Sequence, residues 1–452
     1  MGEMGINTPL SLQTAQAATT VQSAAPAKRE THMAFSSAEE ILSFYRGKRV
    51  FITGHTGFKG SWLSTILVNA GAEVIGFSSG SKEGQLRLFD LCKVGDEIVH
   101  FKANIRHLPA ILGAFHLYQP EIVFHLAAQP IVRESYRNPV ETYMTNVMGT
   151  VNILEAVRRT DSVRSVVNVT TDKVYENREW CWGYRENEPL DGYDPYSNSK
   201  SCSELVTHSY IRSFFNDHSP ASLSASVQSA PSDRAMDGNN YKHTVGNYNN
   251  ENGNEVGMHV AVSTARAGNV IGGGDFAKDR IIPDCVRAAT EGMPIIVRNP
   301  HSIRPYQHVL EPLFAYLLIA AKQYEDAGRY SGYYNVGPDE ADCVETSRLV
   351  DLFCQYWNED NHNEKIAWID QSDGETNAPH EANFLKLDCS RIKTVFGWKP
   401  RWTINTAVEK TVEWSKAWQA GKDVREVMDK QIDEFLSATD VDGSGGENRV
   451  DN

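Results

Sequence analysis

A short β-branched segment that runs into a glycine-spaced turn constrains this chain more than any other feature. Residues 48–53 read as a buried strand, and Gly54, Gly57 and Gly60 follow with the spacing GxxGxxG. Apolar residues at helical spacing come next, at Trp62, Leu63, Ile66, Leu67 and Ala70. In such a unit the first glycine allows the tight turn, the second lets backbone amides approach a pyrophosphate, and the third permits close packing of helix on strand. The pattern predicts a dinucleotide-binding unit, with a purely structural turn as the alternative.

The alternation of strands and helices predicts the fold class. Further strands are expected at residues 73–77, 121–126, 165–170 and 259–265, with helices at 140–159 and 195–215. This order predicts an α/β fold with a doubly wound parallel sheet of Rossmann type over residues 43–275. After residue 275 the pattern is mixed, with short strands at 295–298 and 333–336 and helices at 346–356 and 404–420. We expect a smaller mixed α/β substrate-binding domain over residues 276–436.

Three segments lack the apolar content that a folded core requires. Residues 1–42, 217–257 and 437–452 are polar or without apolar periodicity, and the middle segment is rich in Ser, Asn, Gly and Asp. We expect a mostly disordered N-terminal tail, a disordered insertion within the first domain and a disordered C-terminal tail. A functional lid is the alternative for the insertion. No run has the length of a signal-peptide core or a membrane span.

Charge and cysteine usage exclude several classes of function. The chain has 58 Asp and Glu against 44 Lys and Arg, which argues against a general nucleic-acid binder and against anionic membrane surfaces. Its seven cysteines form no CxxC pair, so neither a zinc cluster nor a disulfide framework is indicated. We expect a cytoplasmic protein that acts on small molecules and uses no metal.

A second motif lies downstream of the glycine turn. Tyr196 precedes Lys200 by one helical turn, so the ammonium is expected to lower the pKa of the phenol and make it a base. Thr171, Asp172 and Lys173 follow the strand predicted at 165–170, at the carboxyl edge of the sheet where doubly wound folds bind ligands. Together these groups predict a proton-transfer site. A structural tyrosine and a surface Asp172–Lys173 ion pair are the alternatives.

The second strand does not settle which dinucleotide binds. NAD-selective folds usually carry an acidic residue there to hold the ribose hydroxyls, but this strand ends in Ser78 and Ser79, followed by Lys82. These three side chains are either acceptors for a 2′-phosphate or parts of an ordinary surface loop. The sequence leaves the choice between NAD and NADP open.

Over roughly residues 43–435 the chain resembles the extended short-chain dehydrogenase/reductase group, and within it the family of CDP-glucose 4,6-dehydratases. The resemblance rests on specific stretches: GHTGFKGSWL at residues 54–63, HLAAQP at 125–130, TTDKVY at 170–175, YSNSK at 196–200, RAGNVIGGGD at 266–275 and RPYQHVLEP at 304–312. The forms His-Thr-Gly-Phe-Lys-Gly and Arg-Pro-Tyr-Gln-His are far more specific than a bare glycine pattern. The insertion and both tails lie outside the resemblance.

The resemblance implies a role for each matching position. It implies NAD as cofactor, held by Gly54, Thr56, Gly57, Phe58, Lys59, Gly60, Ala127, Tyr196 and Lys200. It implies that Tyr196 takes the proton of the sugar 4-hydroxyl during hydride transfer, that Thr171 binds the 4-oxygen and that Asp172 protonates the departing C6 hydroxyl. Asn269, Arg304 and His308 would bind the nucleotide sugar, CDP-glucose, through its pyrophosphate or nucleotide. A homodimer or homotetramer is implied, and the product would commonly feed deoxysugars of bacterial surface polysaccharide.

One position departs from better-known relatives. In dTDP-glucose dehydratases the residue after the aspartate is a glutamate that removes the C5 proton, whereas this chain has Lys173. Lys173 is either that base, with a lowered pKa, or a group that orients Asp172. A sugar 4-epimerase, which needs no elimination acid, and a non-catalytic nucleotide-binding protein are the alternative functions.

Overall fold

The computed structural model describes residues 38–80, 85–215, 260–359, 365–372 and 384–438. The insertion predicted at 217–257 and nearly all of the predicted C-terminal tail lie outside these ranges, as does Lys82. Helix α1 (Ala38–Phe44) begins within the segment predicted as an N-terminal tail. None of the described helices combines the length and apolar content needed to cross a bilayer.

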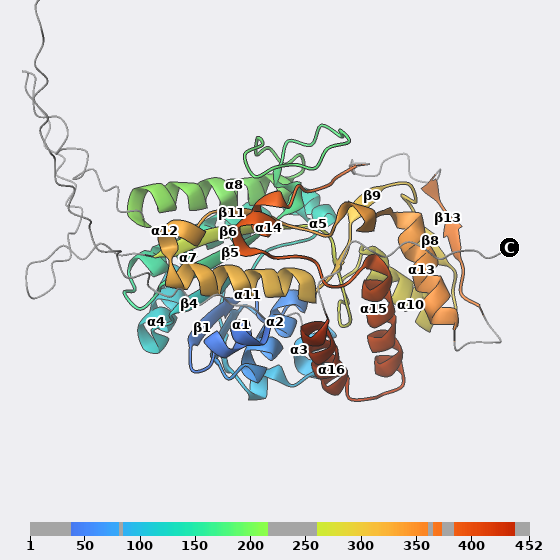
Figure 1. The fold of residues 1–452 in the computed structure, drawn as a ribbon, viewed down its shortest axis with the longest axis horizontal. Helices are drawn as coiled ribbons and strands as arrows, with labels where there is room; N and C mark the ends of the chain where they lie inside the picture. Colours follow the sequence, from blue (N-terminus) through green and yellow to red (C-terminus); the bar gives the residue numbers. More distant parts are fainter. Residues whose placement is uncertain (1–37, 81–84, 216–259, 360–364, 373–383, 439–452) are drawn as a thin grey trace, which may run out of the picture. The chain divides into compact units, whose positions relative to one another are not determined.

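A seven-stranded parallel sheet forms the centre of the fold (Figure 1). Its order is β11-β6-β5-β4-β1-β2-β3, and every neighbouring pair is parallel. The doubly wound fold predicted from the sequence is therefore confirmed. The strands are β1 (Arg49–Thr53), β2 (Glu73–Ser78), β3 (Val99–Lys102), β4 (Ile122–His125), β5 (Ser165–Thr171), β6 (Ala261–Ala267) and β11 (Tyr333–Val336).

Helices cover both faces of this sheet because alternate strand residues are apolar on each side. Val50 and Ile52 of β1 pack with α1, α2 (Phe58–Asn69) and α11 (Leu310–Glu325) on one face. Phe51, between them, packs on the other face with α4 (Leu108–Tyr118) and α7 (Gly149–Arg158). Helix α8 (Pro195–Tyr210) also covers the second face, across the strands from α11 (Figure 1).

Two of the predicted helices contain a π-helical segment. The helix expected at 140–159 is α6 (Pro139–Tyr143), a π-helical turn at Met144–Met148, and α7. The helix expected at 195–215 is α8 followed by a second π-helical turn at Ile211–Phe215. Such turns insert an extra residue into the helical ladder and are frequent near functional sites.

The chain after residue 275 contributes to two layers. Strand β11 pairs with β6 in the main sheet, although the sequence suggested that this segment belongs to the smaller domain. Short sheets pair β7 (Val270–Ile271) with β10 (Gln307–His308), β9 (Ile303–Pro305) with β12 (Cys343–Glu345), and β8 (Ile295–Val297) with β13 (Trp368–Asp370). Helices α10 (Ile281–Thr290), α13 (Thr346–Asn358) and α15 (Ile404–Gln419) pack with these short sheets, whereas α14 (Ser390–Phe396) contacts β11 and α16 (Val424–Ser437) contacts α15.

Two glycine-to-alanine substitutions are expected to have opposite effects on stability, because only Gly60 packs against the tight turn after β1. A Cβ at Gly60 would lie 2.3 Å from the Gly54 carbonyl oxygen, so Gly60→Ala is expected to lower the free energy of unfolding by about 1–3 kcal/mol. Gly113 lies within α4 with no atom in the path of a Cβ, and Gly113→Ala is expected to raise that free energy by about 0.5–1 kcal/mol. Chemical denaturation of both variants measures the difference. Equal effects of the two substitutions would contradict the close packing at Gly60.

Candidate functional site at the carboxyl edge of the sheet

The glycine turn after β1 has the geometry of a dinucleotide cradle. Gly54 has a φ of +72°, and a Cβ there would lie 2.9 Å from the backbone of Ala127 in the loop after β4. Gly57 caps α2, whose first amide groups point out of the helix N-terminus. Only glycine leaves room for these approaches, so the turn presents bare backbone and helix-end positive charge to a ligand. The residues present fit the pyrophosphate of NAD.

At the end of β2, Ser78, one of the side chains considered for a 2′-phosphate, is hydrogen-bonded to the glycine turn. The Ser78 hydroxyl lies 2.8 Å from the Thr56 hydroxyl, and Gly80 N donates to the Ser78 oxygen at 3.4 Å. Lys102, at the end of β3, lies beside Gly80, where a Cβ would be 2.9 Å from its Cε. Its proximity could not be recognised from the sequence because β3 was not predicted.

Thr171, Asp172 and Lys173 stand where β5 ends, as predicted. The Thr171 hydroxyl donates to Asp172 Oδ1 at 2.9 Å and accepts from Lys173 N at 3.4 Å. Asp172 is 2% exposed, and its Oδ2 has no hydrogen-bond partner among the described residues. Burial raises the pKa of Asp172, opposed by Lys173, the Thr171 hydrogen bond, Arg304 and Lys59. Burial thus shifts Asp172 toward its protonated form, and its Oδ2 is available to a ligand.

Tyr196 and Lys200 lie in the first two turns of α8, as predicted, but the expected electrostatic relation between them is wrong for this structure. Burial raises the pKa of Tyr196 to about 12, and the opposing influences are a hydrogen bond with Thr171 and the charge of Arg280. The Lys200 ammonium instead donates to the Val169 carbonyl oxygen at 3.0 Å. Burial lowers the pKa of Lys200 to about 8, against the influence of Glu204. Desolvation thus outweighs the one-turn spacing on which the expectation rested.

Two cations that sequence reasoning did not place beside the tyrosine converge on the same site. Arg280 is held by Asp275, with Nη1 2.8 Å from Oδ2, and its charge acts on both Tyr196 and Lys59. Burial, Arg280 and Lys200 lower the pKa of Lys59 to about 7, opposed by Asp172. Asp275 belongs to the RAGNVIGGGD stretch, so a signal was present in the sequence. The sequence does not show, however, that this loop lies close to Tyr196 in the fold.

The predicted substrate residues divide into two groups. Asn269 and Arg304 line the cavity, and Arg304 acts electrostatically on Asp172. His308 does not line it: the side chain is fully buried, with its ring centroid 5.9 Å from that of Trp62 and 4.8 Å from that of Trp402. The expectation that His308 binds the nucleotide sugar is therefore corrected, because packing between two indole rings leaves it no access to a ligand.

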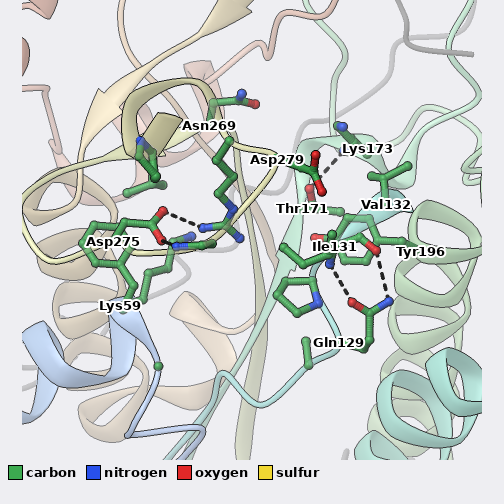
Figure 2. A pocket seen from close by; sticks show the side chains of 18 of the residues that line it. Lys59, Gln129, Ile131, Val132, Thr171, Lys173, Tyr196, Asn269, Asp275 and Asp279 are labelled. Atoms are coloured by element: carbon green, nitrogen blue, oxygen red, sulfur yellow. Dashed lines mark hydrogen bonds and ion pairs between the residues drawn. The ribbon is translucent and has the colours of Figure 1, made fainter. Parts of the chain in front are cut away.

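One cavity of about 1190 Å³ brings the remaining predicted residues together. Its wall includes all of the predicted cofactor and catalytic positions, namely Gly54, Thr56, Gly57, Phe58, Lys59, Gly60, Ala127, Thr171, Asp172, Lys173, Tyr196 and Lys200. Figure 2 shows Thr171, Lys173 and Tyr196 gathered on one side of the cavity, and Lys59 and Asp275 toward the other. The volume suffices for a dinucleotide beside a second elongated ligand. Within the described ranges, no group of three or more His, Cys, Asp or Glu side chains could hold a metal ion.

Comparisons of sequence identify relatives of the whole folded region. A family model described as GDP-mannose 4,6 dehydratase matches residues 51–224. The CDP-glucose 4,6-dehydratase of Salmonella typhimurium is 44% identical over 397 residues, which cover 88% of this chain and 98% of the relative. A probable dTDP-glucose 4,6-dehydratase of Sinorhizobium fredii is 26% identical over 81% of this chain and 92% of its own length.

Solved structures with the same fold share much less sequence. The UDP-glucose 4-epimerase of Thermotoga maritima with UDP-glucose matches with a TM-score of 0.62 at 18% identity, covering 82% of this chain and 99% of that one. The dTDP-glucose 4,6-dehydratase of Bacillus anthracis in complex with NAD matches with a TM-score of 0.60 at 18% identity, covering 83% and 99%. These similarities confirm the fold.

The buried ring of His308 predicts a specific pH dependence of stability. Burial lowers its pKa from 6.5 to about 3, so between these values the unfolded chain binds a proton that the folded chain does not. His308 therefore does not reduce the free energy of unfolding above pH 6.5. As the pH falls below this value, protonation of the unfolded chain lowers that free energy by about 1.4 kcal/mol per pH unit.

His308→Phe keeps an aromatic ring between Trp62 and Trp402 but removes this titration. We expect the unfolding free energy of the variant to fall less steeply between pH 6.5 and 4.5 than that of the wild type, by about 1.4 kcal/mol per unit. Urea denaturation at several pH values measures the two slopes. Parallel slopes would show that His308 is not held in its neutral form.

Proposed function

The chain belongs to the CDP-glucose 4,6-dehydratase family, and we propose that it converts CDP-glucose to CDP-4-keto-6-deoxyglucose and water with an NAD that is recycled within each turnover. The observation that carries this proposal is the connected group Tyr196, Thr171 and Asp172 at one cavity wall, where a proton acceptor and a buried carboxyl group share one hydroxyl. The nucleotide follows from the relative in Salmonella typhimurium.

The cofactor would lie along the glycine turn. Gly54, Thr56, Gly57, Phe58, Lys59 and Gly60 would hold its pyrophosphate, with Ala127, Tyr196 and Lys200 toward the nicotinamide end. When bound, NAD would supply reversible hydride transfer between C4 and C6 of the sugar, and its positively charged nicotinamide ring would favour the Tyr196 phenolate.

Tyr196 would accept the proton of the sugar 4-hydroxyl, and Thr171 would hold the same oxygen. The pKa of Tyr196, about 12 in the protein, must fall for this role, and the Thr171 hydrogen bond and the Arg280 charge already act in that direction. Lys200 lies one turn along α8, where it donates to the Val169 carbonyl oxygen. The resulting 4-ketone acidifies the hydrogen at C5.

Asp172 would supply the proton with which the C6 hydroxyl leaves as water. Burial favours its protonated form, and its free Oδ2 is the atom from which the proton would depart. The C5 proton would leave to Lys173, or to a neighbouring base while Lys173 orients Asp172; both roles agree with the position of Lys173 at the cavity wall. Loss of both groups gives an enone, and hydride addition at C6 completes the 4-keto-6-deoxy sugar.

Asn269 and Arg304 would bind the substrate pyrophosphate. A guanidinium matches phosphate oxygens in charge and geometry, and Arg304 lies close enough to Asp172 to lower the pKa of that carboxyl group. The substrate would therefore span from Arg304 to Tyr196 with its hexose beside Asp172. His308 has no part in this arrangement.

Substitution of Asp172 tests the dehydratase against a 4-epimerase. Asp172→Asn keeps the size of the side chain but cannot release the proton, so we expect the oxidation at C4 to proceed while elimination slows by roughly 10²–10⁴-fold. Absorbance of reduced cofactor in a single turnover measures this accumulation, and Tyr196→Phe, which should show no reduction at all, is the control. Unchanged turnover by Asp172→Asn would remove Asp172 from the mechanism.

We further propose that the enzyme acts as a homodimer, or as a tetramer built from such dimers. Apolar side chains are exposed on adjacent helices of one face: Val140 at 76%, Met144 and Met148 at 41%, and Leu205 at 52%. They extend from α6 through the π-helical turn and onto α8, and a second copy of the same face would cover them. The seven free cysteines agree with a reducing, cytoplasmic location.

A charge placed on this face tests the oligomer. Leu205→Glu and Met144→Glu are each expected to convert the dimer to a monomer, because burying the new carboxylate in the interface costs several kcal/mol. Leu117→Glu, at a residue that is 66% exposed on α4, is the matched control and should leave the assembly intact. Sedimentation velocity measures the masses. A wild-type monomer would contradict the proposal.

A further inference from the structure

A fully buried ion pair lies behind the cavity wall formed by Thr171, Asp172, Lys173 and Tyr196, here called the catalytic wall. It takes no direct part in the proposed reaction. Glu204 of α8 and Arg266 of β6 are both 0% exposed, with Nη2 2.9 Å from Oε2. The carboxylate also accepts hydrogen bonds from the hydroxyls of Thr170 and Thr264. Taking both charges out of water is costly, so a pair kept here needs a reason beyond stability.

The ion pair forms hydrogen bonds with residues on both sides of Thr171, Asp172 and Lys173 in the sequence. Glu204 holds Thr170, the residue directly before Thr171. Arg266 donates to the Tyr175 hydroxyl at 2.8 Å, and Val174 alone separates Tyr175 from Lys173. Tyr175 in turn donates to Asn335 of β11 at 2.6 Å. The triplet Thr171, Asp172 and Lys173 is thus anchored on both sides by one ion pair.

The same pair reaches Lys200 through two routes. Lys200 donates to the carbonyl of Val169, the residue before Thr170, and lies one helical turn before Glu204. Lys200 also acts electrostatically on Lys59 of α2 and on His125 of β4. Burial lowers the pKa of His125 to about 3, so this ring is neutral, and positive charges on Lys59 and Lys200 oppose each other. Glu204 is the anion that opposes desolvation of Lys200.

We propose that Glu204 and Arg266 are positioning residues, which hold the triplet Thr171, Asp172 and Lys173 in place, and that Glu204 also provides the negative charge one helical turn from Lys200. This inference rests on the proposed function, because it concerns the same catalytic wall. The hydrogen bonds of Glu204 with Thr170 and of Arg266 with Tyr175 place contacts of the pair on both sides of the triplet in the sequence.

Two threonines offer a matched test. Each hydroxyl donates to the Glu204 carboxylate, but Thr170 is next to the triplet on β5 and Thr264 is on β6. Thr170→Val and Thr264→Val each remove one such hydrogen bond at nearly constant volume. We expect similar losses in melting temperature, but a kcat lower by roughly ten- to hundredfold for Thr170→Val and within about threefold of wild type for Thr264→Val. Equal kcat losses in the two variants would overturn the positioning role.

A second experiment separates charge from folding. Glu204→Gln leaves Arg266 unpaired in the core, whereas Glu204→Gln with Arg266→Gln replaces the pair by two amides and is expected to restore much of the melting temperature. Without the carboxylate, desolvation lowers the pKa of Lys200 further. We therefore expect the alkaline limb of the kcat profile of the double variant to move to lower pH, with KM for the nucleotide sugar within about twofold of wild type.

The outcomes distinguish the inference from the function on which it rests. A double variant with wild-type kcat and an unmoved alkaline limb would overturn the role of the pair while leaving the dehydratase intact. Absence of product from the wild type would instead contradict the proposed function. If the double variant does not fold, the comparison of Thr170→Val with Thr264→Val still decides the inference.

Discussion

The docking of α8 onto β5 and β6 through polar contacts is the constraint on which the site depends. Lys200, Ser201, Ser203, Glu204 and Thr207 are all buried on the sheet side of this helix, where most helices present an apolar stripe. Ser201 donates to the Val174 carbonyl at 2.7 Å, and the hydroxyls of Ser203 and Thr207 accept from Asn168 of β5. Buried polar groups tolerate little displacement, because each lost partner leaves a desolvated donor or acceptor. The helix is therefore fixed in rotation and height relative to the strand ends.

The fixed position of α8 brings its catalytic residues to the edge of the sheet where the ligand-binding loops meet. Parallel strands end at one edge, so the glycine turn after β1, the loop after β4 and the triplet after β5 meet there, and α8 adds Tyr196 and Lys200. The low polarity of the surroundings raises the pKa of Asp172 and lowers that of Lys59 and Lys200. A carboxyl group with a raised pKa is suited to donate a proton, which the elimination of the C6 hydroxyl requires.

Most of the fold and of the cavity wall could be predicted from the sequence, because strand periodicity, the glycine spacing and the Tyr-Lys pair are local patterns. The misses have physical causes. The strand expected at 259–265 is found at Ala261–Ala267, since an apolar run alone does not fix strand ends. His308 looked like a ligand-binding residue because a motif records identity but not burial. Arg280 and Glu204 act on Tyr196 and Lys200, respectively, and neither effect follows from composition or periodicity. The predicted direction of the Tyr196 pKa shift was wrong for the same reason, since desolvation depends on every element packed around the phenol.

The internal hydride transfer can be tested directly by following the hydrogen from C4 to C6. Purified protein would be incubated with NAD and CDP-glucose deuterated at C4, and in parallel with dTDP-, UDP- and GDP-linked glucose, with products identified by NMR. We expect a 4-keto-6-deoxy sugar from CDP-glucose alone, with the deuterium carried to C6. A product inverted at C4, deuterium lost to water, or no product from any donor would contradict it.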